Sequence, residues 1–233
     1  MFMWTEKKIS WYERAIDASP FLNDLTDTLI PFLNRGETIG ELGCGTGDLS
    51  LELTRRGYDV TAVDIDQMAV EHVLRQSKIA STPVKVYHGD WASAIDRYKW
   101  DTVIMCFAGN IRSEIDLFMR GCRRQLLYVT QEPCQEHICF RSSSGEPSEY
   151  RLYEAQMQEL LEQKGLVYKL INAELELGQP FHDEREAVDY MILYGKPEEQ
   201  IEHALKCLVK RENKQYPLYL PKKKNVKIYQ ILK

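Results

Sequence analysis

The chain has 233 residues, of which 44% are hydrophobic and 28% are charged, and its formal net charge is −5. These figures are typical of a globular protein long enough to bury a large core, so they exclude a disordered chain, a collagen-like repeat and a disulfide-rich miniprotein. The acidic balance argues against a nucleic-acid partner, since general nucleic-acid binders carry a basic surface.

Strands and helices are predicted to alternate over the first 130 residues. Apolar residues recur at helical spacing from Phe21 to Leu33, after a Ser19-Pro20 pair that predicts the helix start. The elements predicted next are a strand at 38–42, a helix at 48–56, a strand at 59–64, a helix at 67–79, strands at 84–87 and 101–107, a helix at 113–122 and a strand at 126–130. The strand at 101–107 is almost continuously apolar, which is typical of a strand buried on both faces. This alternation predicts an α/β fold with a mostly parallel sheet.

The pattern is less regular after Thr130. Residues 131–149 contain two prolines and a Ser-Ser-Ser-Gly cluster, which predict a strand or loop with a turn. The elements predicted beyond it are a helix at 150–164, a sixth strand at 166–177, helices at 183–194 and 197–210, and a last strand at 226–232. No internal repeat or linker is recognisable. We therefore expect a single domain over residues 1–233, with an N-terminal helical cap at 1–35 and a helical insertion at 178–224 before the last strand.

The cysteines and the N-terminus bear on the cellular compartment. The six cysteines are irregularly spaced, which fits reduced thiols better than a disulfide framework. Cys134, His137 and Cys139 suggest a metal site, but zinc sites usually pair two such short spacings and no second pair is present, so we predict no metal. The first ten residues lack the features of a secretory signal, and the longest apolar run has six residues, whereas a membrane-spanning helix needs about 20. We expect a cytoplasmic protein without a membrane partner.

Positive charge is concentrated near the C-terminus. Residues 196–233 hold ten Lys or Arg and four Asp or Glu, and Lys222-Lys223-Lys224 is the densest run. A solvated helix face followed by a tail is the plainer interpretation. The alternative interpretation is a site for an anionic substrate or partner.

A glycine-rich turn follows the first predicted strand, in the sequence Glu41-Leu42-Gly43-Cys44-Gly45-Thr46-Gly47. Glycines at alternate positions let the chain turn sharply between strand and helix, and they let a ligand lie against bare backbone. The dinucleotide fingerprint G-x-G-x-x-G would need a glycine at position 48, where the chain has Asp48. An aspartate at this helix N-terminus would also repel a pyrophosphate, so an NAD-type oxidoreductase is disfavoured.

The turn resembles motif I of the class I S-adenosylmethionine-dependent methyltransferases, read as Glu41-x-Gly43-x-Gly45-x-Gly47. The resemblance implies that the acidic residue and the glycine loop hold the methionine part of S-adenosylmethionine, which carries no phosphates. A second mark is Asp64, 21 residues after Gly43 at the end of the next strand. Its carboxylate would accept both ribose hydroxyls in charge-assisted hydrogen bonds.

Two further marks follow in order, each after a predicted strand. His88-Gly89-Asp90-Trp91 resembles the family's adenine-binding turn, where Asp90 would accept the adenine amino group and Trp91 would pack on the ring. The alternative for Asp90 is a helix N-cap. Cys106-Phe107-Ala108-Gly109 stands where the family lines the cofactor edge and opens towards the substrate, although Cys44 and Cys106 fit buried packing residues better than nucleophiles. The predicted cofactor-binding residues are Glu41, Gly43, Cys44, Gly45, Gly47, Asp64, Ile65, Asp90, Trp91, Cys106 and Phe107.

The resemblance covers residues 38–130 well. It implies a Rossmann-like seven-stranded sheet, mostly parallel, with the last strand antiparallel and helices on both faces. It also implies transfer of a methyl group from S-adenosylmethionine by in-line displacement, for which the protein supplies alignment and excludes water. After the fourth strand the chain has neither the Asn-Pro-Pro-Tyr-type motif of base-flipping enzymes nor the acidic pair of metal-dependent catechol-type enzymes. A small-molecule acceptor remains.

No catalytic residue is assigned, because a general base is needed only if the nucleophile keeps its proton at neutral pH. The candidates are Tyr12, His137, and His182 with Asp183. Trp11 and Tyr12 would form either an aromatic lid near the sulfonium or a packing pair. The alternative functions are a non-catalytic methyltransferase-like protein, whose basic C-terminal segment would be a docking surface, and, less favoured, an NAD-type oxidoreductase.

Overall fold

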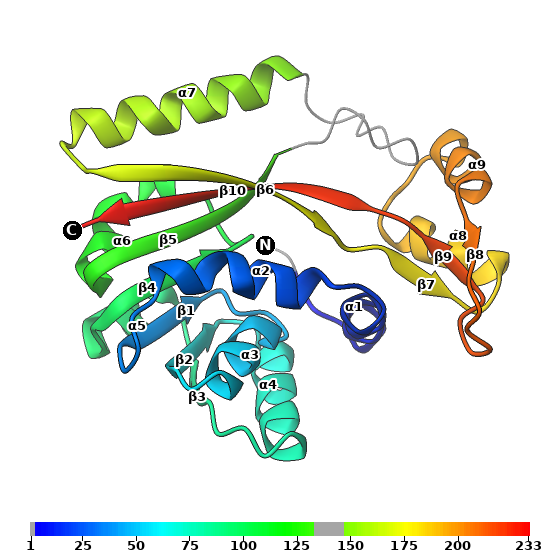
Figure 1. Ribbon diagram of the computed structural model, residues 1–233, viewed down its shortest axis with the longest axis horizontal. Coiled ribbons are helices and arrows are strands. Elements are labelled where there is room, and N and C mark those ends of the chain that lie inside the picture. Colours follow the sequence, from blue (N-terminus) through cyan, green and yellow to red (C-terminus); the bar gives the residue numbers. More distant parts are fainter. Residues whose placement is uncertain (1–2, 133–146) are drawn as a thin grey trace.

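The computed structural model describes residues 3–132 and 147–233. A seven-stranded sheet in the order β3-β2-β1-β4-β5-β10-β6 forms its centre, and helices cover both faces of this sheet (Figure 1). β10 runs antiparallel to its neighbours β5 and β6, whereas β1 to β5 pair in parallel. The predicted fold class, a mostly parallel Rossmann-like sheet with the last strand antiparallel, is confirmed.

The strands of this sheet are β1 (Thr38–Leu42), β2 (Asp59–Asp64), β3 (Lys85–His88), β4 (Trp100–Cys106), β5 (Cys122–Glu132), β6 (Tyr168–Glu176) and β10 (Lys223–Leu232). The helices that accompany it are α1 (Glu6–Asp17), α2 (Phe21–Leu29), α3 (Asp48–Arg55), α4 (Gln67–Ile79), α5 (Trp91–Arg97), α6 (Ile115–Gly121) and α7 (Pro147–Gln163). Two short 3-10 helices, η1 (Ile30–Phe32) and η2 (Ile111–Ser113), lie beside α2 and α6.

Each face of the sheet has its own apolar core. In β4, Val103 and Met105 point to the face that α5, α6 and α7 cover, while Ile104 points to the face that α2 and α3 cover. All three side chains are fully buried. Because successive side chains of a strand alternate between faces, an apolar run without alternation is what a strand covered on both sides requires. The prediction of a doubly buried strand here is confirmed.

Some predicted boundaries are wrong. Ser19 does not cap α2: Pro20 occupies the N-cap position, and the Ser19 hydroxyl donates a hydrogen bond to the carbonyl of Ala15 instead. Helix α5 was not predicted, because its seven residues make only about two turns, which is too short for a helical period to be recognised. Strand β5 is longer than predicted, since its N-terminal part pairs with β4 and its C-terminal part pairs with β10.

The segment between β6 and β10 contains a small unit with its own core. It holds α8 (Glu184–Leu193) and α9 (Glu198–Lys206), packed against a second sheet of β7 (Gln179–Phe181), β9 (Leu218–Leu220) and β8 (Val209–Lys210). Helices were expected at residues 178–224, and the three-stranded sheet was not. In Figure 1 this unit lies beyond the ends of β6 and β10, on the side where α1 is found, and α1 contacts β7.

Several expectations fall on residues 133–146, outside the described residues. They concern the turn predicted there, and Cys134, His137 and Cys139 as metal ligands or base. Across residues 3–132 and 147–233, no helix has both the length and the apolar character needed to cross a membrane.

Candidate active site

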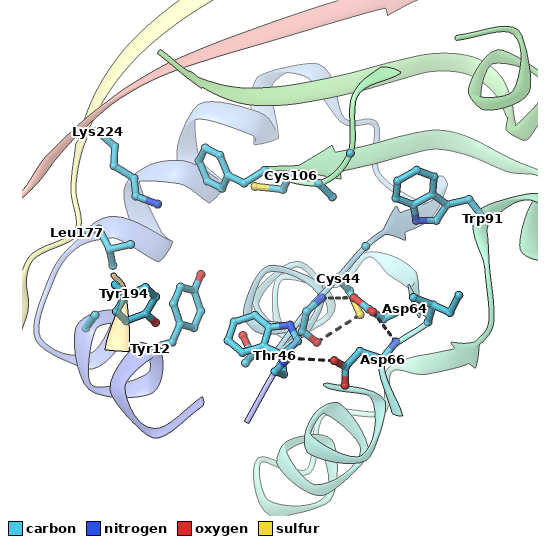
Figure 2. Close-up of a pocket in the computed structure, with 18 of the residues that line it drawn as sticks. Tyr12, Cys44, Thr46, Asp64, Asp66, Trp91, Cys106, Leu177, Tyr194 and Lys224 are labelled. Carbon is cyan, nitrogen blue, oxygen red and sulfur yellow. Dashed lines mark hydrogen bonds between the residues drawn. The ribbon is translucent and has the colours of Figure 1, made fainter. Parts of the chain in front are cut away.

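A cavity of about 880 Å³ opens at the carboxyl-terminal edge of the central sheet. Its walls come from the turns after β1, β2, β3 and β4, from α1 and α8, and from the residues just before and at the start of β10. Ligands of open α/β sheets bind at this edge, because the turns there point away from the packed core. Figure 2 shows Asp64 and Trp91 towards one end of the cavity and Lys224, Leu177 and Tyr194 at the other.

The glycine turn is fixed to the neighbouring strand by its backbone. The amides of Gly43 and Cys44 both donate to the carbonyl of Val63, over 2.8 and 3.0 Å. The amide of Gly45 donates to Oδ2 of Asp64, over 2.7 Å. These bonds hold the turn open towards the cavity, which Gly43, Cys44, Gly45 and Thr46 line.

Two of the glycines are required by close packing. Gly43 has a φ of +75°, and a Cβ there would lie 2.6 Å from Cβ of Ala108 on the turn after β4. Gly47 has a φ of +76°, and a Cβ there would lie 2.4 Å from a methyl group of Val73 in α4. Gly47 therefore lets α3 pack against α4 and does not line the cavity.

Asp64 ends β2 with both carboxylate oxygens directed at backbone amides. Oδ2 accepts from Gly45, and Oδ1 accepts from the amide of Asp66 over 2.9 Å. A carboxylate offers about four lone-pair positions, so it can accept two further hydroxyls from the cavity that it lines. Asp66 was not predicted; it caps α4 and accepts from the amide of Trp4 over 3.0 Å. Ile65, which was predicted, lines the cavity between them.

Asp90 and Trp91 line the cavity after β3. Asp90 is the N-cap of α5 and accepts from the amide and the hydroxyl of Ser93, over 2.9 and 2.8 Å. The backbone bond from Ser93, helped by its hydroxyl, lowers the pKa of Asp90, so this carboxylate stays charged. Trp91 is held edge-on against Phe118. This contact orients the flat indole of Trp91, which lines the cavity.

Cys106 and Phe107 form the wall after β4. Phe107 has a φ of +53°, a strained conformation for a residue with a side chain, and its amide donates to the carbonyl of Val129. Its ring stacks on Phe21 of α2 with centroids 6.2 Å apart. Burial raises the pKa of the thiols of Cys106 and Cys44. Both thiols therefore stay protonated at neutral pH, which is consistent with packing and not with a nucleophile.

Like Gly47, Glu41 is a predicted residue that does not line the cavity. It is buried below the glycine turn and accepts a hydrogen bond from the hydroxyl of Ser50 in α3. Burial, which outweighs the Ser50 hydrogen bond, raises the pKa of Glu41 to about 8. Nine of the eleven predicted residues meet at the cavity, while Glu41 and Gly47 support its floor from behind.

Replacing Glu41 by glutamine should change how stability depends on pH. The folded carboxyl has the higher pKa, so the folded state binds more protons than the unfolded state between about pH 4.5 and pH 8. This stabilisation of the wild type is complete below about pH 4.5, the pKa of the unfolded carboxyl. It is lost as the pH rises through about 8, the pKa of the folded one. We expect Glu41→Gln to be more stable than the wild type at pH 8, by roughly 2–4 kcal/mol, with little difference at pH 4.5. Urea unfolding at both pH values measures this, and an equal difference at the two would contradict a buried neutral carboxyl.

The candidate bases separate clearly in the structure. Tyr12 lines the cavity, whereas Trp11 is buried against Tyr190 with ring centroids 5.0 Å apart. Of the two residues, Trp11 therefore has the predicted packing role, and only Tyr12 reaches the site. His182 and Asp183 do not line this cavity, so they lie apart from the predicted cofactor-binding residues. His182 packs against the Tyr216 ring, and Asp183 caps α8.

The insertion and the last strand supply cavity residues that the sequence analysis missed. They are Leu177, Gln179, Tyr190, Tyr194, Lys196, Lys222 and Lys224. The excess of lysine after residue 196 was the available signal. For Lys222 and Lys224 the plainer interpretation, a solvated tail, is wrong, because both line the cavity. Among the described residues no group of three or more His, Cys, Asp or Glu is placed to hold a metal ion.

Residues 39–127 match the family model described as a methyltransferase domain. This span contains the glycine turn and the cavity residues Asp64, Asp90 and Cys106. The comparison with curated proteins gave no match.

The fold is shared with solved structures of different described activity. One is a magnesium protoporphyrin IX methyltransferase (ChlM) from Synechocystis PCC 6803 with bound SAH, at 15% identity and a TM-score of 0.54 over 91% of this chain and 81% of that one. Another is a SAM-dependent methyltransferase from Thiobacillus denitrificans in complex with S-adenosyl-L-homocysteine, at 16% identity and a TM-score of 0.54 over 90% and 89%. A third is a candidate RNA methyltransferase, PH1948 from Pyrococcus horikoshii, at 16% identity and a TM-score of 0.53 over 91% and 83%. Identities this low show a common fold, and the two acceptors that are named, magnesium protoporphyrin IX and RNA, differ.

Proposed function

The chain belongs, by the domain that residues 39–127 match, to the class I S-adenosylmethionine-dependent methyltransferases, and we propose that it methylates a small-molecule acceptor at the end of the cavity formed by α1 and the insertion. S-adenosylmethionine is its cosubstrate. When bound, this cosubstrate supplies an activated methyl group on a sulfonium, which an acceptor removes by in-line displacement.

The hydrogen-bond acceptors of the cavity fit this cosubstrate. Asp64, Asp66 and Asp90 all line the end of the cavity near the glycine turn. Carboxylates in this arrangement suit ribose hydroxyls, an amino group and a positive sulfonium, whereas they would repel a pyrophosphate. This supports S-adenosylmethionine over a nicotinamide dinucleotide.

We assign the predicted residues accordingly. Asp64 accepts the ribose hydroxyls, and Asp90 with Trp91 holds the adenine. The turn from Gly43 to Thr46 lies along the methionine part. Cys106 and Phe107 stand where the methyl group faces the acceptor, and their apolar surfaces exclude water from the transfer.

The shape of the acceptor end carries the proposal of a small molecule. Tyr12 from α1 and Gln179, Tyr190 and Tyr194 from the insertion wall this end of the cavity. The cavity volume lies in the range of small-molecule sites, which supports a ligand that enters this end whole. The protein's task is then alignment of the acceptor with the methyl group.

Thermal unfolding with S-adenosylmethionine, S-adenosylhomocysteine or NADH tests the cosubstrate. A ligand at about 100 times its dissociation constant adds about 2.7 kcal/mol of stability, so either adenosyl ligand should raise the Tm by roughly 5–10 °C. NADH should leave the Tm unchanged. A shift with NADH alone would contradict the assignment.

Release of S-adenosylhomocysteine then tests the acceptor. The enzyme is incubated with S-adenosylmethionine and, separately, with mixtures of small organic acids, phenols and amines or with bulk tRNA. Release is expected with one of the small-molecule mixtures. Release with tRNA alone would contradict a small-molecule acceptor while leaving the methyltransferase activity intact.

A further inference from the structure

Three lysines gather at the acceptor end of the cavity. Lys196 follows α8, Lys222 precedes β10, and Lys224 is the second residue of β10. The backbone carbonyl of Lys222 accepts from the amide of Leu177 over 2.8 Å, which aligns this stretch of chain with the end of β6. Side chains of extended chain alternate in direction, so Lys222 and Lys224 face the cavity while Lys223 faces away.

Lys224 differs from the lysines beside it in its surroundings. Its ammonium lies over the rings of Phe107 and Phe21, at 4.6 and 5.2 Å from their centroids. Among the side chains that the structure describes, no carboxylate lies within 4 Å of it, whereas Lys223 pairs with Glu174 at 2.5 Å. Figure 2 shows the Lys224 ammonium directed towards the cavity, on the same side as Tyr12 and Tyr194.

Within the described parts of the chain, the two ring faces compensate the Lys224 charge and no carboxylate does so, whereas buried charges are normally paired. Burial, together with the charge of Lys222, lowers the pKa of Lys224 to about 8. Burial and the charge of Lys196 likewise lower the pKa of Lys222. The cavity therefore has one end with several carboxylates and one end with several ammonium groups. An anion bound at the second end would be attracted by the Lys224 ammonium.

The hydroxyls beside Lys224 can add hydrogen bonds to the same anion. Burial raises the pKa of Tyr12, and burial also raises the pKa of Tyr194. Both phenols therefore stay neutral and keep a proton to donate. An oxyanion surrounded by an ammonium and hydroxyl donors has the charge-assisted bonds that make such a site strong.

We propose that the acceptor carries an oxyanion, a carboxylate or a phosphate, which Lys224 binds at the end of the cavity away from Asp64 and Trp91. The inference rests on the proposed function, because it names the chemical class of the molecule to be methylated. Holding the anion at Lys224 fixes one end of the acceptor, so that its nucleophile reaches the methyl group beside Cys106 and Phe107. Lys224 is a specificity-determining residue in this assignment.

Lys224→Met and Lys223→Met make a matched pair of variants. Methionine keeps an unbranched stem of similar length and removes the charge. Lys223 lies next in the chain and faces away from the cavity, so its variant controls for a general loss of positive charge. The wild type and both variants are saturated with S-adenosylhomocysteine. Their Tm is followed as chloride is replaced by acetate or by inorganic phosphate at constant ionic strength.

The wild type and Lys223→Met should gain Tm with at least one oxyanion, and Lys224→Met should bind that oxyanion at least tenfold more weakly. A response to acetate alone assigns a carboxylate, a response to phosphate alone assigns a phosphate, and a response to both assigns recognition by charge. The affinity of Lys224→Met for S-adenosylhomocysteine should stay within twofold of that of the wild type.

Three results would overturn the inference. The first is a wild type that responds to neither oxyanion, and the second is a Lys224→Met protein that responds as the wild type does. The third is a tenfold loss of S-adenosylhomocysteine affinity in Lys224→Met alone, which would assign Lys224 to the carboxylate of the cosubstrate. Failure of the proposed function has a separate signature, because S-adenosylhomocysteine itself would then leave the wild-type Tm unchanged.

Discussion

Asp64→Ala should lower the affinity for S-adenosylmethionine by at least tenfold. The carboxylate is placed to accept the ribose hydroxyls, and a hydrogen bond to a charged group contributes about 1.5–3 kcal/mol. The variant also loses the acceptor that fixes the Gly45 amide at 2.7 Å, so the glycine turn is less well ordered before the ligand binds. Isothermal titration calorimetry with S-adenosylhomocysteine measures the affinity, and the far-ultraviolet circular dichroism spectrum should show an unchanged fold.

Asp59→Ala is the matched control for this variant. Asp59 lies at the opposite end of the same strand, where its carboxylate pairs with Lys85 at 2.6 Å on the surface. Exposed ion pairs contribute about 0–1 kcal/mol, so this variant should keep both its stability and its affinity for S-adenosylhomocysteine. An unchanged affinity in Asp64→Ala would remove Asp64 from the cosubstrate site.

Gly43→Ala should weaken both the fold and the binding of S-adenosylhomocysteine. The left-handed conformation at position 43 costs a non-glycine residue roughly 1–2 kcal/mol. The new Cβ would lie 2.6 Å from that of Ala108, and overpacking of this kind costs a further 1–3 kcal/mol. Relief of the contact must separate the turns after β1 and β4, which adjoin each other in the wall of the cavity. We therefore expect at least a tenfold loss of affinity by calorimetry, and a loss of roughly 2–5 kcal/mol in urea unfolding.

Gly36→Ala separates the two causes. Gly36 has a φ of +81°, similar to that of Gly43, but a Cβ there would meet nothing within 4 Å. Its variant carries the conformational strain without the contact, so it should lose only the smaller stability and bind S-adenosylhomocysteine as the wild type does. Equal effects of the two variants would show that strain, and not the approach of Ala108, is what position 43 requires.

Local patterns were sufficient for the central sheet. The apolar run of β4 indicated burial on both faces, and the position of Asp64 at the end of β2 indicated a side chain at the ligand edge. Such features depend on strand period and on the rule that ligands meet parallel strands at their carboxyl ends. Element ends were less predictable, because the extent of β5 depends on pairing with β4 and β10 and not on its own residues.

The glycine motif illustrates the limit of spacing within the site. Gly43 and Gly45 line the cavity, whereas Gly47 packs on Val73 and Glu41 accepts from Ser50. The four residues of the motif are all spaced two positions apart. Two of them nevertheless face the cavity, and the other two face the helices behind the turn. Which side a residue occupies depends on the two helices packed behind the turn, α3 directly after it and α4, which follows only after β2.

The sequence by itself determined the fold class, the cosubstrate edge and most of the residues that line it, because each depends on a short stretch of chain and its period. Tertiary structure alone decided the acceptor end. Tyr12, Tyr194 and Lys224 are separated by up to 212 positions in the chain, and they meet only because β10 inserts between β5 and β6 and brings its first residues to α1 and the insertion. The physical reason is that the lining of this end depends on which distant side chains share one volume, and the sequence shows the excess of lysine after residue 196 but not which of these lysines face the cavity.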